Sequence, residues 1–63
     1  MHTDYDLFEQ FPDGSVMWRG SAASEAEAQS LLSSIAKKPS NEYFAVILKT
    51  NQEFLRVNGA GTH

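Results

Sequence analysis

The stretch Phe-Pro-Asp-Gly-Ser at residues 11–15 decides the fold of this 63-residue chain. Proline presets its own φ, aspartate tolerates the next position, and glycine can adopt the positive φ that closes a three-residue hairpin loop. The segments on either side, residues 5–11 and 15–20, mix apolar and polar residues with a period near two. They are therefore predicted to form two antiparallel strands. The register that follows places Phe8 opposite Trp18, Glu9 opposite Met17 and Leu7 opposite Arg19.

A helix is predicted after this hairpin. Ser24 and Glu27 have the spacing of a capping box, in which the serine hydroxyl accepts from the Glu27 amide and the Glu27 carboxylate reaches back. Acidic residues in the first turn and Lys37-Lys38 in the last complement the helix dipole, and Pro39 prevents continuation, so the helix should span residues 25–38. One apolar stripe predicts the face that packs on the core: Ala28, Leu31, Leu32, Ile35 and Ala36.

A second hairpin is predicted to follow the helix. Residues 42–49 are apolar on both sides at their centre, as in a central strand. A turn through Asn51, which accepts positive φ, then leads into a fourth strand. A two-residue loop in this turn gives the expected register, with Leu48 opposite Leu55 and Val46 opposite Val57.

The order of these elements predicts an α+β fold, ββαββ, in a single domain over residues 1–63. Four antiparallel strands form one sheet, and the helix packs on one face. If the first strand lies between the second and third, the helix makes a right-handed crossover and the strand order is 2-1-3-4. The ordered core is expected over residues 4–58, with a flexible tail over residues 59–63, which lack an apolar anchor.

One helix covers only one face of such a sheet, so the two faces need separate assignments. The face expected beneath the helix carries Phe8, Val16, Trp18, Phe44, Val46, Leu48, Leu55 and Val57. The alternative face would bury Glu9 and Arg19, which is costly for charged groups. The uncovered face is then expected to present ten interface candidates: Tyr5, Leu7, Phe11, Met17, Arg19, Tyr43, Ile47, Lys49, Phe54 and Arg56.

These residue types favour an interaction surface. Aromatic residues, methionine and arginine are enriched at protein interfaces, and this face is more apolar than a small monomer usually exposes. We therefore expect a non-enzymatic protein-interaction module that forms a homodimer or docks a protein partner. Two alternatives stay open: long lysine and arginine stems could simply cover the aromatics, or the face could bind single-stranded nucleic acid or a small ligand. The net charge of −3 argues against nucleic acid.

The composition argues against a catalytic or metal-binding site. The chain has no cysteine, and its two histidines, His2 and His63, fall in tails expected to be mobile. Asp4 and Asp6 supply too few oxygen ligands for a cation and are expected to form a solvated acidic edge. No enzyme activity, cofactor or metal is therefore expected. The polar start and the lack of a long apolar stretch predict a cytoplasmic protein with no membrane contact.

Several local motifs together resemble a set of short bacterial proteins of unknown function. They are Tyr5-Asp6-Leu7-Phe8-Glu9, Pro12-Asp13-Gly14, Trp18-Arg19-Gly20 and Glu25-Ala26-Glu27-Ala28. The likeness covers most of residues 5–48, and its motifs are turn, cap and core signals. The resemblance implies a bacterial cytosolic protein and supplies no functional residues.

Overall fold

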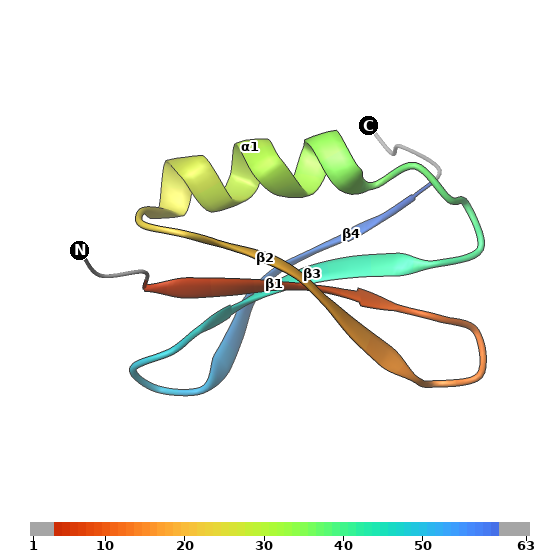
Figure 1. Cartoon of the computed structure of the whole chain (residues 1–63), viewed down its shortest axis with the longest axis horizontal. Helices are drawn as coiled ribbons and strands as arrows, with labels where there is room; N and C mark the ends of the chain where they lie inside the picture. The colour runs from red at the N-terminus through yellow and green to blue at the C-terminus, as the bar shows by residue number, and fades with distance from the viewer. Residues whose placement is uncertain (1–3, 60–63) are drawn as a thin grey trace.

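A four-stranded antiparallel sheet carries one helix on a single face in the computed structural model, which describes residues 4–59 (Figure 1). The strand order is β2-β1-β3-β4, so the predicted ββαββ fold and its 2-1-3-4 order are confirmed. The elements are β1 (Tyr5–Gln10), β2 (Val16–Ala22), α1 (Glu25–Ile35), β3 (Glu42–Ile47) and β4 (Gln52–Asn58). Among the described residues, no helix is long and apolar enough to span a membrane.

The first hairpin closes as its turn sequence predicts. The Phe11 amide donates to the Ser15 carbonyl at 2.9 Å, and the Gly14 amide donates to the Phe11 carbonyl at 2.9 Å. Gly14 has a φ of 94°, a conformation that glycine adopts at no steric cost. The Asp13 carboxylate accepts from both the amide and the hydroxyl of Ser15, which holds the loop in shape.

Beyond this turn, a β-bulge changes the register of the hairpin. Phe8 lies opposite Trp18, and Glu9 opposite Met17, as expected. Leu7, however, pairs with Gly20, because Arg19 is the extra residue of a bulge in β2. Gly20 adopts a φ of 150°, which residues with a side chain rarely do, and this freedom admits the bulge.

The helix begins at its capping box and ends earlier than predicted. The Ser24 hydroxyl accepts from the Glu27 amide at 3.2 Å, and the Glu27 carboxylate accepts from the Ala23 amide at 3.0 Å. The prediction over residues 25–38 is wrong at its end, since α1 stops at Ile35. Lys38 precedes a proline and so avoids helical angles. Its amide donates to the Tyr43 hydroxyl at 3.2 Å instead.

The second hairpin departs from its predicted register. β3 stops at Ile47, and a four-residue loop over 48–51 leads to β4. Asn51 takes the expected positive φ, 62°, and its amide donates to the Ile47 carbonyl. A β-bulge then adds Phe54 as an extra residue of β4, so Val57 pairs with Tyr43, three positions along β3 from the expected Val46. A shift by an odd number of residues changes which side chains share a face.

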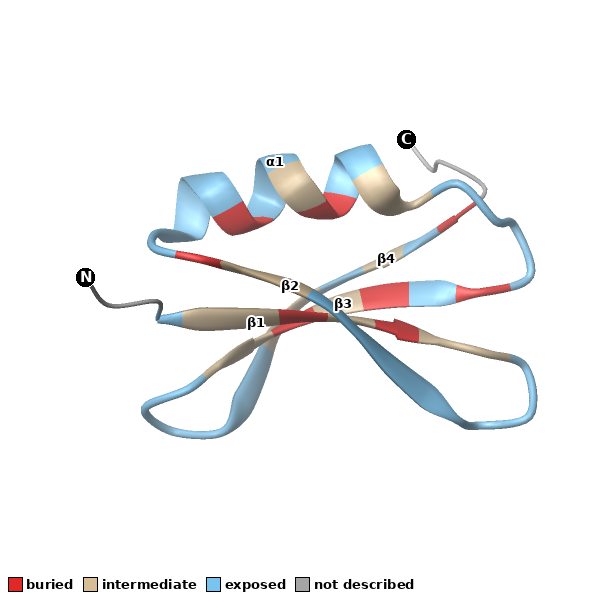
Figure 2. Ribbon diagram, in the orientation of Figure 1, coloured by how far each residue is buried: buried red, intermediate tan, exposed pale blue. Residues whose placement is uncertain are grey.

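The faces of β1, β2 and β3 are exchanged relative to the prediction. Figure 2 shows the buried positions on the side of α1 that faces the sheet and along β1 and β3. The buried apolar residues are Leu7, Ala22, Ala28, Leu32, Tyr43 and Ala45. Packed against them and partly buried are Tyr5, Leu31, Ile35, Ala36, Phe54, Leu55 and Val57. The helix stripe, Leu55 and Val57 thus meet the core as expected, whereas Leu7 and Tyr43, expected in the open, lie beneath the helix.

The end of β4 is anchored to the loop after the helix. Gly59 was expected to start the flexible tail, but it is buried, and its amide donates to the Asn41 carbonyl at 3.1 Å. The rest of that predicted tail, residues 60–63, lies outside the described residues, as do His2 and His63.

Candidate functional site

A buried carboxylate explains why the faces are exchanged. Glu9 lies on the helix-covered side of β1 and is 2% exposed. One of its oxygens, Oε2, accepts from Asn41 Nδ2 at 2.5 Å and from the Tyr43 hydroxyl at 3.0 Å. The other, Oε1, forms an ion pair with the guanidinium of Arg19, the bulged residue of β2.

The partners of Glu9 keep it charged. Burial raises the pKa of Glu9, but the hydrogen bonds from Asn41, Tyr43 and Arg19, with the Arg19 charge, outweigh burial and leave the pKa below its usual value. A buried charge is costly when it is unpaired, and this one is paired and hydrogen-bonded. The expectation that Glu9 must face solvent is therefore wrong.

The opposite side of the sheet carries a row of aromatic side chains. Residues that alternate with Leu7 and Glu9 point away from the helix. There Trp18, Phe8, Phe44 and Arg56 lie side by side, one from each strand in the order β2, β1, β3 and β4. We call these four residues the aromatic row.

Ring contacts join the members of the aromatic row. The rings of Phe8 and Phe44 are stacked, with centroids 5.4 Å apart and an interplanar angle of 23°. The Arg56 guanidinium lies 4.6 Å from the centroid of the Phe44 ring, within cation–π range. Trp18, at the other end, is 59% exposed, and its strand neighbour Val16 is 50% exposed. The arginine thus covers one end of the row, and the tryptophan end stays open.

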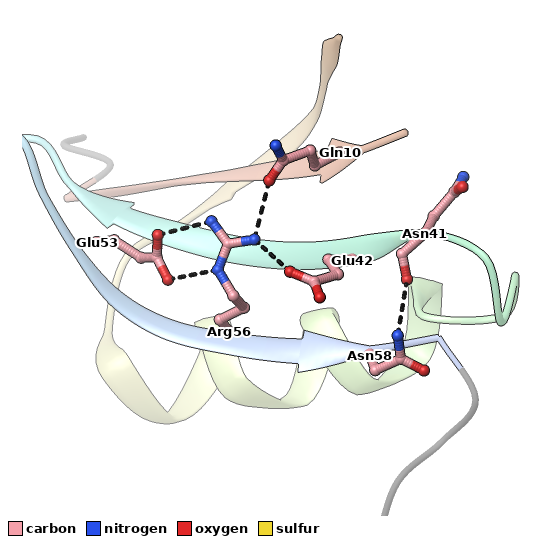
Figure 3. A network of polar contacts seen from close by, with 6 residues as sticks. All are labelled: Gln10, Asn41, Glu42, Glu53, Arg56 and Asn58. Carbon is pink, nitrogen blue, oxygen red and sulfur yellow. Dashed lines mark hydrogen bonds and ion pairs between the residues drawn. The ribbon is translucent and has the colours of Figure 1, made fainter. Parts of the chain in front are cut away.

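Acidic groups hold the arginine of this row in place (Figure 3). Arg56 donates from Nε and Nη2 to Glu53, and from Nη1 to Glu42 at 2.5 Å and Gln10 at 2.9 Å. The hydrogen bonds from Arg56 hold the pKa of Glu53 below its usual value, and those to Glu53 and Glu42 raise the pKa of Arg56. Asp6 lies on the same face, two positions from Phe8 along β1. Around the row, three carboxylates therefore outnumber a single guanidinium.

The ten interface candidates from the sequence do not form one surface. Leu7 and Tyr43 are buried, and Tyr5 and Phe54 pack on each other at the edge of the core, with ring centroids 5.2 Å apart. Only Arg56 of the ten belongs to the aromatic row. Ile47 and Lys49 lie near Tyr5 at one end of the sheet, and Phe11, Met17 and Arg19 line a hollow at the C-terminal end of α1.

This hollow is the second candidate site, with a volume of about 450 Å³. β1, β2, β3 and the end of α1 contribute its walls, and Lys37 and Lys38 lie on its rim. It lies on the helix side of the sheet, so it is separate from the aromatic row.

Comparisons with protein-family models, with curated proteins and with solved structures gave no match to this chain. The resemblance to short bacterial proteins therefore stays a prediction.

Proposed function

We propose that this protein is a non-enzymatic interaction module that self-associates through the helix-free face of its sheet. The aromatic row is the observation that carries this proposal. Trp18 and Val16 expose large apolar side chains beside two stacked phenylalanines, and tryptophan is among the residues that contribute most to binding at interfaces. Exposed apolar surface of this kind on a small domain is typical of a protein contact.

The order of side chains in the row favours a second copy of the chain as the partner. A two-fold interface brings the same surface of both copies together, so residue i contacts j and j contacts i. A two-fold axis parallel to the strands reverses the row. It sets Trp18 of one copy over Arg56 of the other, and Phe8 over Phe44. Each arginine would then lie between its own Phe44 and the tryptophan of the second copy, in cation–π contact with both.

Single-stranded nucleic acid is the weaker candidate for this face. Stacking platforms for nucleic acid combine aromatics with free basic groups that attract phosphates. Here the guanidinium of Arg56 is bound by Glu42 and Glu53, and Asp6 adds a third carboxylate. The guanidinium of Arg56 is therefore not available to attract a phosphate backbone.

The core is small, so association would add appreciably to the stability of the fold. Among the described residues, the buried apolar set numbers six. Domains of this length have little stability to spare, and binding to a second copy adds to it by mass action.

Sedimentation equilibrium tests the proposal. Wild-type protein, measured from about 10 μM to about 1 mM, should show a reversible monomer–dimer equilibrium. Trp18→Glu should weaken dimerisation by about 30-fold or more, with the circular dichroism spectrum unchanged, because Trp18 is exposed and supplies the contact to Arg56 of the second copy. Leu48→Glu is the matched control, since Leu48 is also exposed, at 43%, but lies in the β3–β4 loop outside the row.

Two outcomes would contradict self-association. One is a wild-type protein that stays monomeric at the highest concentration, and the other is a Trp18→Glu variant that dimerises like Leu48→Glu. Titration with an oligothymidylate addresses the alternative. Salt-dependent binding that Trp18→Glu abolishes would replace the proposal with nucleic-acid recognition.

A further inference from the structure

We propose that the hollow at the C-terminal end of α1 binds a small molecule in which a carboxylate is joined to an apolar body. This site is independent of the aromatic row and lies on the other side of the sheet. Its volume of about 450 Å³ falls within the range of roughly 300–1,000 Å³ that is usual for small-molecule pockets.

The walls of the hollow are mainly apolar and come from separate elements. Phe11 follows β1, Met17 lies on β2, Ile35 ends α1, and Tyr43 lies on β3. Met17 is 48% exposed, so one wall is open to an entering ligand. These side chains would take up the apolar body, and methionine adapts easily to different shapes.

Basic groups gather around this apolar hollow. Arg19, Lys37 and Lys38 are three of the five lysines and arginines in a chain whose net charge is −3. Arg19 is neutralised by Glu9. Within residues 4–59, neither lysine ammonium forms an ion pair, so two positive charges at the rim have no counter-ion there. A ligand carboxylate would supply that counter-ion.

Glu9 also lines the hollow, but it would not repel such a ligand strongly. Its two oxygens are occupied by Arg19, Asn41 and Tyr43, and its side chain is almost fully buried. The ion pair with Glu9 also holds the Arg19 guanidinium in position. The guanidinium still has N–H groups beyond the one bound to Glu9, and a ligand carboxylate could accept from them.

The backbone of the rim is fixed before a ligand arrives. The Lys37 amide donates to the Ile35 carbonyl at 2.8 Å, and the Lys38 amide donates to the Tyr43 hydroxyl. The early end of the helix therefore places both lysines beside the hollow instead of in a last helical turn. A preorganised rim of this kind lowers the entropic cost of binding.

Titration with octanoate, followed by ¹H–¹⁵N NMR, tests the proposal, with 1-octanol as the uncharged comparison. Octanoate should shift the amide signals of Phe11, Met17 and Lys38 and bind about fivefold more tightly than 1-octanol. The double variant Lys37→Gln/Lys38→Gln should remove most of that difference. Lys49→Gln is the matched control, because Lys49 is an exposed lysine at the other end of the sheet.

The proposal fails if octanoate and 1-octanol bind wild type equally, if the double variant binds octanoate as tightly as Lys49→Gln, or if the shifts fall elsewhere. All three lysines are exposed, so their variants should keep the fold. Trp18→Glu should bind octanoate normally. A monomeric protein that still binds octanoate would contradict only the self-association.

Discussion

Arg19 is the counter-ion of a carboxylate that has almost no contact with solvent. Arg19→Gln leaves Glu9 with two neutral donors and no opposite charge. We expect the free energy of unfolding to fall by about 1–3 kcal/mol, less than for a fully buried pair because the Arg19 side chain is 35% exposed. Urea unfolding followed by circular dichroism measures this loss.

Arg56→Gln is the matched control for that experiment. Arg56 has the same side-chain exposure, but its partners Glu42 and Glu53 are exposed, so in protein dilute enough to be monomeric its loss should cost less than about 1 kcal/mol. Equal losses in the two variants would mean that Glu9 does not depend on its arginine.

The environment of Glu9 also marks a limit of inference from sequence. The rule against burying a charge holds for a lone carboxylate. The donors that overcome it, Asn41 and Tyr43, lie 32 and 34 residues away along the chain. No local pattern connects them to Glu9, so the burial of this residue, and with it the exposure of Phe8, could not be predicted.

The helix depends on a cap that the sequence does reveal. Ser24→Ala removes the acceptor for the Glu27 amide and should lower the free energy of unfolding by about 1 kcal/mol. Ser33→Ala is the control, since Ser33 is exposed in the last part of α1 and alanine is the better helix former. Urea unfolding of both variants checks the prediction, and an equal loss in both would contradict it.

Elements with a local cause were predictable, and those set by distant contacts were not. The turn at residues 11–15 and the capping box each contain their own hydrogen-bond partners. In the second hairpin the local turn signal is Asn51 alone, and a residue with positive φ fits loops of several lengths. Lys38 lies outside the helix, and its amide donates to the Tyr43 hydroxyl, a partner that the helix pattern does not contain. Candidate site residues inherited the error over Glu9, because the side of the sheet that buries Glu9 also buries Leu7 and Tyr43.

At the scale of the whole molecule, one polar network determines both surfaces. By holding Glu9 inside, Asn41, Tyr43 and Arg19 turn the odd-numbered residues of β1 toward the helix. The even-numbered Phe8 then joins Phe44 on the open face, and Arg19 comes to lie beside the hollow. The buried network thus positions both the aromatic row on the open face and Arg19 beside the hollow on the helix side.

Acid should destabilise the fold through this network and through two carboxylates outside it, Glu53 and Asp13. The pKa values of Glu9, Glu53 and Asp13 are lower in the folded protein than their usual values, because hydrogen bonds favour the charged forms. Each group therefore contributes stability that is present above its unfolded-state pKa and is lost as the pH falls through the folded value. For the glutamates that loss begins near pH 4.3, roughly the unperturbed value, and continues below it.

The variant Glu9→Gln isolates the contribution of the buried carboxylate. It should be less stable than wild type at pH 7, because the glutamine amide cannot neutralise Arg19. Its urea midpoint should fall less than that of wild type between about pH 5 and about pH 3, since one of the titrating groups is gone. Both proteins are compared at one concentration, because dimerisation adds stability by mass action. If Glu9→Gln loses stability with acid as steeply as wild type, the acid sensitivity arises at the surface carboxylates and the buried network does not control it.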